Sequence, residues 1–270
     1  MLGKPGGTVK DLNGHLPDHI RVWVCIHAAR HFNAHRLCDL RKYEYVFPTW
    51  ILDQWRCRER AFYAQNGTTS KDSHPEYIFD SDLLDRLNSL LGQYEGSHSF
   101  HNFTVRAEAE GTTVTRDILH CGTCGVIDMQ GEQFVRVSIV GRSFMLHQIR
   151  KMVGLVIAMA RYIAPEFCLK AALAPQNVMA VPVAPEVGLM LVECVYDEYN
   201  KQNNHACISL QQFQDEALVF KDKLIYPSIA RRTRDLKVFE NWLPTVNDNA
   251  FKFSTWNRSG GALPNGSSRA

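Results

Sequence analysis

The residues best suited to chemistry lie in a segment with helical periodicity, 143–160. Its His147, Arg150 and Lys151 fall opposite an apolar stripe, which predicts a basic face on a core-packed helix. Such a face is ordinarily solvated. The alternative is that it lines a cleft, where arginine offers a planar, permanently charged fork to a phosphate or a carboxylate. The basic side also includes Gly154 and Arg161, and the stripe consists of Met145, Ile149, Met152, Val153, Val156 and Met159.

A second polar cluster lies in the short stretch 96–104, where His98, His101 and Asn102 accompany two phenylalanines. Imidazole, amide and aromatic groups together suit stacking on unpaired bases and hydrogen bonding to bases or ribose. An ordered strand entry, with Phe100 and Phe103 in the core, accounts for the same composition equally well. The residues alone leave both interpretations open.

Metal chemistry is suggested only by Cys121 and Cys124, whose spacing, with His120 beside them, is that of half a zinc site. No second pair with this spacing completes the site. Gly122 and Gly125 favour a turn between two strands, so we interpret the motif as structural. The eight cysteines are scattered through apolar segments, which predicts free thiols in a reducing compartment and no disulfides.

Strand and helix patterns together must position these residues. Leucines recur at helical spacing between 83 and 91, with Asp80 or Ser81 available as the N-cap. Further helices are expected near the C-terminus, over 210–221 and about 234–242. Strands are predicted where apolar residues alternate or cluster, over 20–26, 42–47, 116–120, 133–140 and 190–196.

Bulk composition narrows the class of protein but not the function. A hydrophobic content of 45% over 270 residues is enough for one large core or two modest ones. The net charge of +2 neither excludes nor indicates a nucleic-acid partner. No apolar run approaches the roughly 18 residues of a membrane span, and residues 1–7 lack the apolar core of a signal peptide. We therefore expect an intracellular, soluble protein.

Several motifs, taken in order, resemble the TruA-type tRNA pseudouridine synthases and especially their eukaryotic branch. The helix Ser-Phe-Met-Leu-His-Gln-Ile-Arg-Lys-Met-Val-Gly at 143–154 is similar to the family's signature helix, and 98–104 is similar to an element upstream of it. The segments 15–20, 32–34, 38–45 and 188–191 also match family patterns. The resemblance runs from about Leu12 to Tyr199 and continues more weakly through 225–227.

The resemblance implies an α+β fold with antiparallel sheets and packed helices around a basic cleft that binds tRNA. The target uridine would be flipped out of its stack, detached from the ribose, turned and rejoined through C5, with no metal and no cofactor. Arg150 corresponds to the arginine that pairs with the catalytic aspartate, and Tyr43 to the aromatic that stacks on the target base. Weaker candidates for RNA contact, or for ordering the cleft, are Arg41, His98, His101, Asn102, His147 and Lys151.

The family's catalytic aspartate lies in an Arg-Thr-Asp-[Lys/Ala]-Gly-Val motif that should precede residues 15–20, and the 270 residues contain no such motif. We therefore expect an N-terminally truncated member: an enzyme by family, or alternatively a non-catalytic RNA-binding module. The eukaryotic motifs favour the nucleus, with mitochondrion and cytoplasm as alternatives, although the basic run 231–234 is too short for a convincing import signal. The expected divisions are an N-terminal subdomain remnant at 1–60, a linker at 61–75, a C-terminal subdomain at 76–200, a helical extension at 201–253 and a disordered tail at 254–270.

Overall fold

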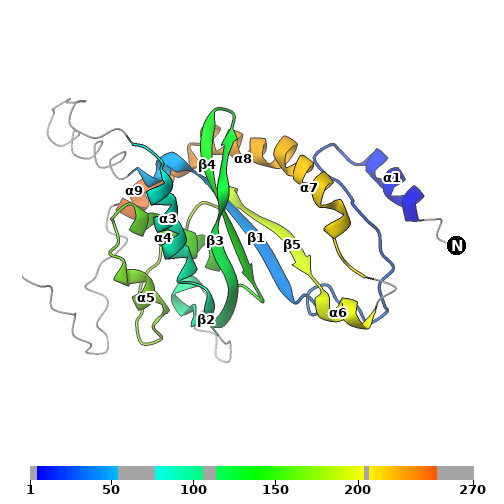
Figure 1. Cartoon of the computed structure of the whole chain (residues 1–270), viewed down its shortest axis with the longest axis horizontal. Coiled ribbons are helices and arrows are strands. Elements are labelled where there is room, and N and C mark those ends of the chain that lie inside the picture. The colour runs from blue at the N-terminus through cyan, green and yellow to red at the C-terminus, as the bar shows by residue number, and fades with distance from the viewer. Residues whose placement is uncertain (1–4, 54–76, 106–113, 204–206, 248–270) are drawn as a thin grey trace, which may run out of the picture.

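The computed structural model describes residues 5–53, 77–105, 114–203 and 207–247. Five strands in these residues form one antiparallel sheet in the order β2-β3-β4-β1-β5 (Figure 1). Together with the helices this confirms the α+β fold expected from the resemblance. The strands are β1 Leu40–Pro48, β2 Gly96–Ser99, β3 Thr115–Met129, β4 Glu132–Gly141 and β5 Leu189–Val195.

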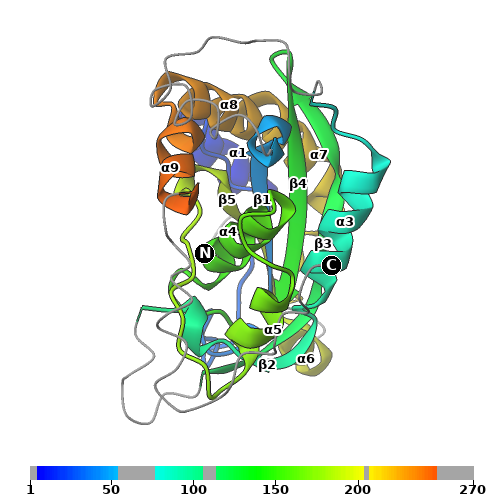
Figure 2. The same ribbon diagram turned by 90° about the vertical axis from the view of Figure 1, so that its left-hand side faces the viewer.

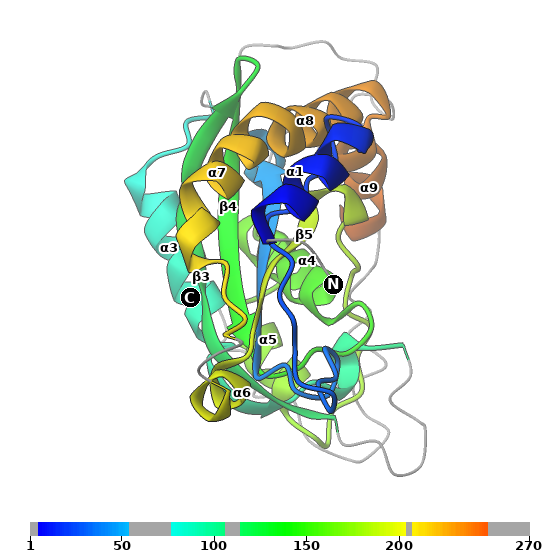
Figure 3. The same ribbon diagram turned by 90° about the vertical axis from the view of Figure 1, so that its right-hand side faces the viewer.

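Helices cover both faces of the sheet. One face carries α3 and α4, which Figure 2 shows from their side, and the other carries α7 and α8, which lie in front of the sheet in Figure 3. No helix in the described part of the chain is long and apolar enough to cross a membrane. The helices are α1 Pro5–His15, α3 Ser81–Gly92, α4 Gln148–Ala160, α5 Phe167–Leu173, α6 Asp197–Gln202, α7 Gln214–Phe220, α8 Tyr226–Asp235 and α9 Val238–Asn247, with a π-helical turn at Lys221–Ile225.

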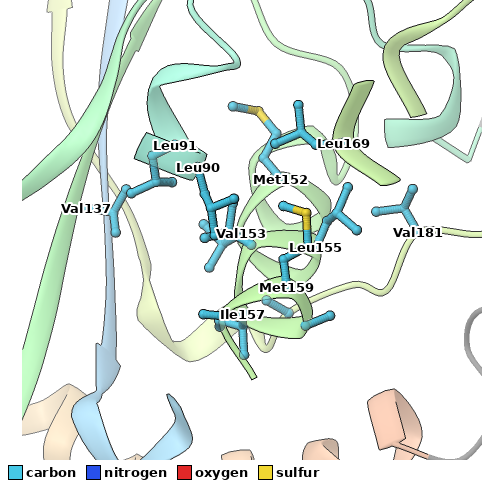
Figure 4. Close-up of a cluster of buried hydrophobic side chains, with 14 of the residues drawn as sticks. Leu90, Leu91, Val137, Met152, Val153, Leu155, Ile157, Met159, Leu169 and Val181 are labelled. Atoms are coloured by element: carbon cyan, nitrogen blue, oxygen red, sulfur yellow. The ribbon is translucent and has the colours of Figure 1, made fainter. Parts of the chain in front are cut away.

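The main core lies between the sheet and helices α3 and α4. Alternation along β1 turns Tyr45 and Phe47 toward this core and Val46 toward α8 on the opposite face. Leucines of α3 and apolar residues of α4 meet Val137 of β4 in the same core (Figure 4). Asp80 caps α3 as predicted, since its carboxylate accepts a hydrogen bond from the Leu83 amide at 2.9 Å.

Helix α4 is buried nearly all round, so the interpretation of its basic side as a solvated face is wrong. Twelve of its thirteen residues are buried, and Arg150 is the exception. The buried residues include Lys151, and Arg161 just after the helix is buried too. Arg161 donates to the carbonyls of Ile51 and Asp53. The helix also begins at Gln148 rather than near 143, because His147 has a left-handed backbone with φ 64°.

The expected strand over 20–26 is wrong. Its alternating pattern is present, but in the described residues no strand pairs with it. The Asn13 side chain takes the place of a partner strand at one residue, since it donates to the Val22 carbonyl and accepts from the Val22 amide, both at 2.8 Å. Alternation of apolar residues alone therefore does not establish a sheet pairing.

The Cys121–Cys124 motif does not form the expected turn. Strand β3 passes through it, with an irregular register between Thr123 and Gly125. No group of three potential metal ligands occurs in the described residues, and the seven cysteines among them are free thiols. The C-terminal helices also differ from expectation, because α8 ends at Asp235 and α9 begins at Val238 after Lys237, whose φ is 47°.

The sheet joins the two segments that the sequence analysis assigned to separate subdomains. Strand β1, from the segment 1–60, lies between β4 and β5, both from the segment 76–200. The expected linker at 61–75 and the expected tail at 254–270 lie outside the described residues. The described part of 1–60 that includes β1 therefore contributes an internal strand to the sheet.

A buried carboxylate attaches the C-terminal helices to the sheet. Glu44 of β1 accepts hydrogen bonds from Tyr226 Oη at 2.6 Å, Lys221 Nζ at 2.9 Å and Arg136 Nη2 at 3.2 Å. Burial raises the pKa of Glu44, but its three donors outweigh burial and hold that pKa below its ordinary value. Glu44 therefore links β1, β4 and the start of α8.

We expect Glu44→Gln to lower the free energy of unfolding by about 2 kcal/mol at pH 7, because Arg136 and Lys221 lose a charged acceptor. Since the folded-state pKa is lowered, this stabilisation is present above the unfolded-state value of about 4.3 and disappears as the pH falls through the lower folded value. Urea unfolding from pH 7 to pH 3 measures the difference.

The matched control is Glu193→Gln on neighbouring β5. Glu193 also accepts from a lysine, Lys42 at 2.8 Å, but that lysine side chain is 42% exposed, so the loss should be below about 1 kcal/mol. Equal losses for the two variants would show that Glu44 has no special anchoring role.

Candidate active site

The site is built around Arg150, the one incompletely buried residue of α4. A short segment of chain packs against this helix so closely that a Cβ on Gly154 would lie 2.3 Å from the Pro182 carbonyl oxygen. Beyond that point the Ala184 amide donates to the Arg150 carbonyl at 3.0 Å, and Arg150 Nε donates to the Ala184 carbonyl at 2.7 Å. The helix and the segment thus hold the base of the guanidinium in one orientation.

The outer nitrogens of Arg150 face more open groups. Nη1 lies 3.3 Å from His147 Nδ1 and 3.5 Å from the carboxylate of Glu186, whose side chain is 80% exposed. Nη2 makes no hydrogen bond to the described residues. Because the Arg150 side chain itself is 18% exposed, part of its fork remains available to a carboxylate or a phosphate.

Tyr43 lies on the face of the sheet that packs against α4, the helix that carries Arg150. Two residues further along β1, Tyr45 is fully buried and donates its hydroxyl to the Pro185 carbonyl at 2.5 Å, between the two residues that contact Arg150. Tyr43 is only partly buried, and its ring meets Phe144 edge to face at 5.2 Å. Partial burial raises the Tyr43 pKa, so the phenol stays neutral and its ring is suited to stacking.

The polar loop after β2 packs inward. Phe100 and Phe103 are fully buried, and the Asn102 side chain donates to the Ala172 and Asn177 carbonyls at 2.9 Å and accepts from the Met179 amide at 3.0 Å. Lys151 donates to the Asn102 and Thr104 carbonyls at 2.9 and 3.1 Å, and burial lowers the pKa of its ammonium. This geometry favours the ordering role for Asn102 and Lys151 over direct RNA contact.

The remaining predicted residues are more accessible. His101 binds the Asn177 carbonyl at 2.6 Å and Ser99 at 2.9 Å, whereas the His98 ring is hydrogen-bonded, among the described residues, to the Glu95 carbonyl at 2.8 Å. Arg41 uses its two terminal nitrogens on the Arg142 and His35 carbonyls, at 2.8 and 3.2 Å. Their role in RNA contact, like that of His147, stays a prediction.

Comparison with known proteins shows which protein family the region around Arg150 matches. Residues 91–197, which span β2 to β5 and α4, match the sequence model of a family described as tRNA pseudouridine synthase. The chain belongs to this family. Several curated proteins match this chain over most of the chain's length.

The "Pseudouridylate synthase 1 homolog" of Mus musculus is 33% identical over 239 residues, which are 87% of this chain and 53% of the relative. The Homo sapiens protein of the same name is 32% identical over 88% of this chain and 53% of its own length. The "tRNA pseudouridine synthase 1" of Yarrowia lipolytica is 26% identical over 92% of this chain and 60% of the relative. The chain thus spans about half the length of the first two relatives.

Two residues beside the site of this pseudouridine synthase family member were not singled out from sequence. The contact between Glu186 and Arg150 is known only from the structure, because nothing in the sequence pairs the two residues. Leu191 lies directly opposite Tyr43 in the β1–β5 register and is 51% exposed. The Gly-Leu-Met-Leu motif at 188–191 indicates a strand at this position, but the sequence does not show that Leu191 pairs with Tyr43.

Proposed function

We propose that this protein acts in the isomerisation of uridine to pseudouridine in tRNA. The site lies where Tyr43 of β1 and Arg150 of α4 occupy the same side of the sheet. The observation that carries the proposal is the placement of Arg150. It is the only residue of α4 that is not buried, its base is held by Ala184, and it lies in the region that matches the tRNA pseudouridine synthase family. The names of the relatives agree with this activity.

The reaction is redox-neutral. The bond between ribose C1′ and uracil N1 breaks, the base turns, and a bond forms between C1′ and C5; N1 gains a proton and C5 loses one. Partly exposed Tyr43, with exposed Leu191 opposite it, offers an apolar surface on which an unstacked base can lie. Arg150 would hold a carboxylate ionised beside the ribose, since a guanidinium within hydrogen-bonding reach favours the charged form.

The second candidate function is RNA binding without isomerisation. It is favoured by one observation in the described residues, the exposure and distance of the carboxylate that pairs with Arg150. The carboxylate that does contact Arg150, Glu186, is 80% exposed and 3.5 Å away, a weak pairing for a catalytic group. Under this hypothesis Tyr43 and Arg150 still contact RNA, but no bond is broken.

A pseudouridine assay on unmodified tRNA transcript separates the two functions. The chain of 270 residues is compared with the same chain extended at its N-terminus by the family's aspartate-containing segment. Activity in the extended protein, abolished when that aspartate becomes asparagine, supports the enzyme. Binding of tRNA by both proteins with activity in neither supports the RNA-binding module, and absence of binding in both excludes both functions.

Tyr43→Ala is expected to weaken tRNA binding by about 1 to 3 kcal/mol, because a base that stacks on the ring loses its platform. Tyr43→Phe keeps the ring and should bind within about twofold of the wild type, since the contact with Phe144 uses the ring and not the hydroxyl. Fluorescence anisotropy with tRNA measures both. Normal binding by the alanine variant with a lowered melting temperature would instead assign Tyr43 to the core alone.

A further inference from the structure

A cluster of cations on helix α8 and just beyond its C-terminal end is not used by the Tyr43–Arg150 site. Arg231, Arg232, Arg234 and Lys237, here called the α8 patch, are all exposed. No carboxylate of the described residues forms an ion pair with any of them, and Asp235 is the single acidic residue between 231 and 237. Because the whole chain has a net charge of only +2, this concentration of positive charge is local.

The fold fixes the direction in which the patch points. The opposite side of α8 is buried against the sheet through Tyr226, Ile229 and Ala230, which pack on Val46 and Phe134. Tyr226 also donates to the buried carboxylate of Glu44. The three arginines therefore lie on the exposed side of a helix whose other side is anchored to the sheet.

The patch lies at the opposite end of the sheet from the stacking ring. Arg234 Nη2 donates at 3.1 Å to Gln130, in the turn between β3 and β4, and Figure 1 shows α8 beside that hairpin end. Tyr43 pairs with Ile139, seven residues along β4 from Glu132, which corresponds to about 23 Å at the usual strand rise. Tyr43 and α8 also lie on opposite faces of the sheet, so a ligand that touches both places must be extended and reach around the sheet.

Ordinary helix-dipole compensation does not account for this arrangement. Cations in the last turn of a helix stabilise it by about 0.3 to 1 kcal/mol, but Asp235 at the same end opposes the effect, and Lys237 lies beyond the helix. The side chains also suit a ligand that presents oxyanions. Arginine forks bind phosphate oxygens, while no aromatic residue occurs between 231 and 237 to stack on a base.

We propose that the α8 patch is a second RNA-binding surface, which contacts the phosphodiester backbone of the substrate tRNA away from the target uridine. The inference rests on the proposed function, since it concerns the same RNA. It assigns to the patch a contact with phosphates that is independent of base sequence, and it leaves base recognition and chemistry to the Tyr43–Arg150 site.

The test compares two doubly neutralised proteins that have lost the same charge. Arg231→Gln with Arg232→Gln removes half of the patch but leaves the Arg234–Gln130 contact. The control, Lys10→Gln with Lys170→Gln, removes two exposed lysines on α1 and α5. Binding of unmodified tRNA transcript is measured by anisotropy over a series of KCl concentrations, and thermal unfolding verifies that each protein is folded.

For the patch variant we expect a tenfold loss of affinity, and a slope of log K against log salt reduced by about 1.5, since each lost phosphate contact contributes about 0.7 to 0.9. The control should keep the wild-type slope. An unchanged slope in the patch variant, or equal changes in both variants, overturns the proposal; the unchanged slope would direct the search to an acidic protein partner. If Arg150→Ala weakens binding while the patch variant does not, only this inference fails, whereas a wild type that binds no tRNA overturns the proposed function as well.

Discussion

Arg150→Ala is expected to reduce pseudouridine formation by about 1,000-fold in a form of the protein that is active, because a fixed charge beside the reacting groups is lost from a site where Nε and the backbone already hold it in place. The loss should appear in the single-turnover rate at saturating tRNA. Burial of the neighbouring α4 residues means that no other described side chain of the helix can move into the position.

Two further variants define what Arg150 does. Arg150→Lys keeps the charge but loses the fork, so it should recover only part of the lost rate. Glu186→Gln removes the exposed carboxylate at 3.5 Å and should change the rate by less than about threefold, because such pairs contribute little. A normal rate in Arg150→Ala would remove this residue from the site. A large loss of rate in Glu186→Gln would instead show that the Glu186 carboxylate takes part in the reaction.

The structure explains why the placement of some candidate residues could be predicted from sequence and that of others could not. Arg150 and Tyr43 lie in motifs with a strong resemblance to one family, and helical and strand periodicity place each in the right element. Whether Lys151 faces solvent or the protein depends on what lies beside α4. The answer is the loop 102–104, whose carbonyls bind the ammonium, and that loop is nearly fifty residues away in sequence.

The same limit applies to the fold. The alternating pattern of 20–26 is real, but a strand requires a partner, and in the described residues Val22 is bonded by the Asn13 side chain instead. The β1–β5 register, which brings Leu191 opposite Tyr43, is likewise a property of two distant segments. Local sequence indicates which residues can be buried or extended, whereas pairing is decided by tertiary contacts.

The second large effect is expected at Gly154, where the fold and the site depend on one close contact. Alanine at this position would place a methyl group 2.3 Å from the Pro182 carbonyl oxygen, so α4 or the segment 182–186 must shift. In helices alanine is favoured over glycine by about 1 kcal/mol, but a clash with backbone costs up to about 3 kcal/mol, so we expect a net loss of about 2 kcal/mol. Urea unfolding measures this loss.

Gly92→Ala is the matched control, because the same change at the end of α3 would place its Cβ with nothing within 4 Å. It should leave stability unchanged or slightly raised. The displaced segment of the Gly154 variant includes Ala184, which holds Arg150, so its activity should also fall by about 100-fold, as expected for a displacement of about 1 Å in a positioned group. A Gly154→Ala protein as stable and active as the Gly92→Ala protein would contradict the close packing of α4 against 182–186, and with it the geometry that orients Arg150.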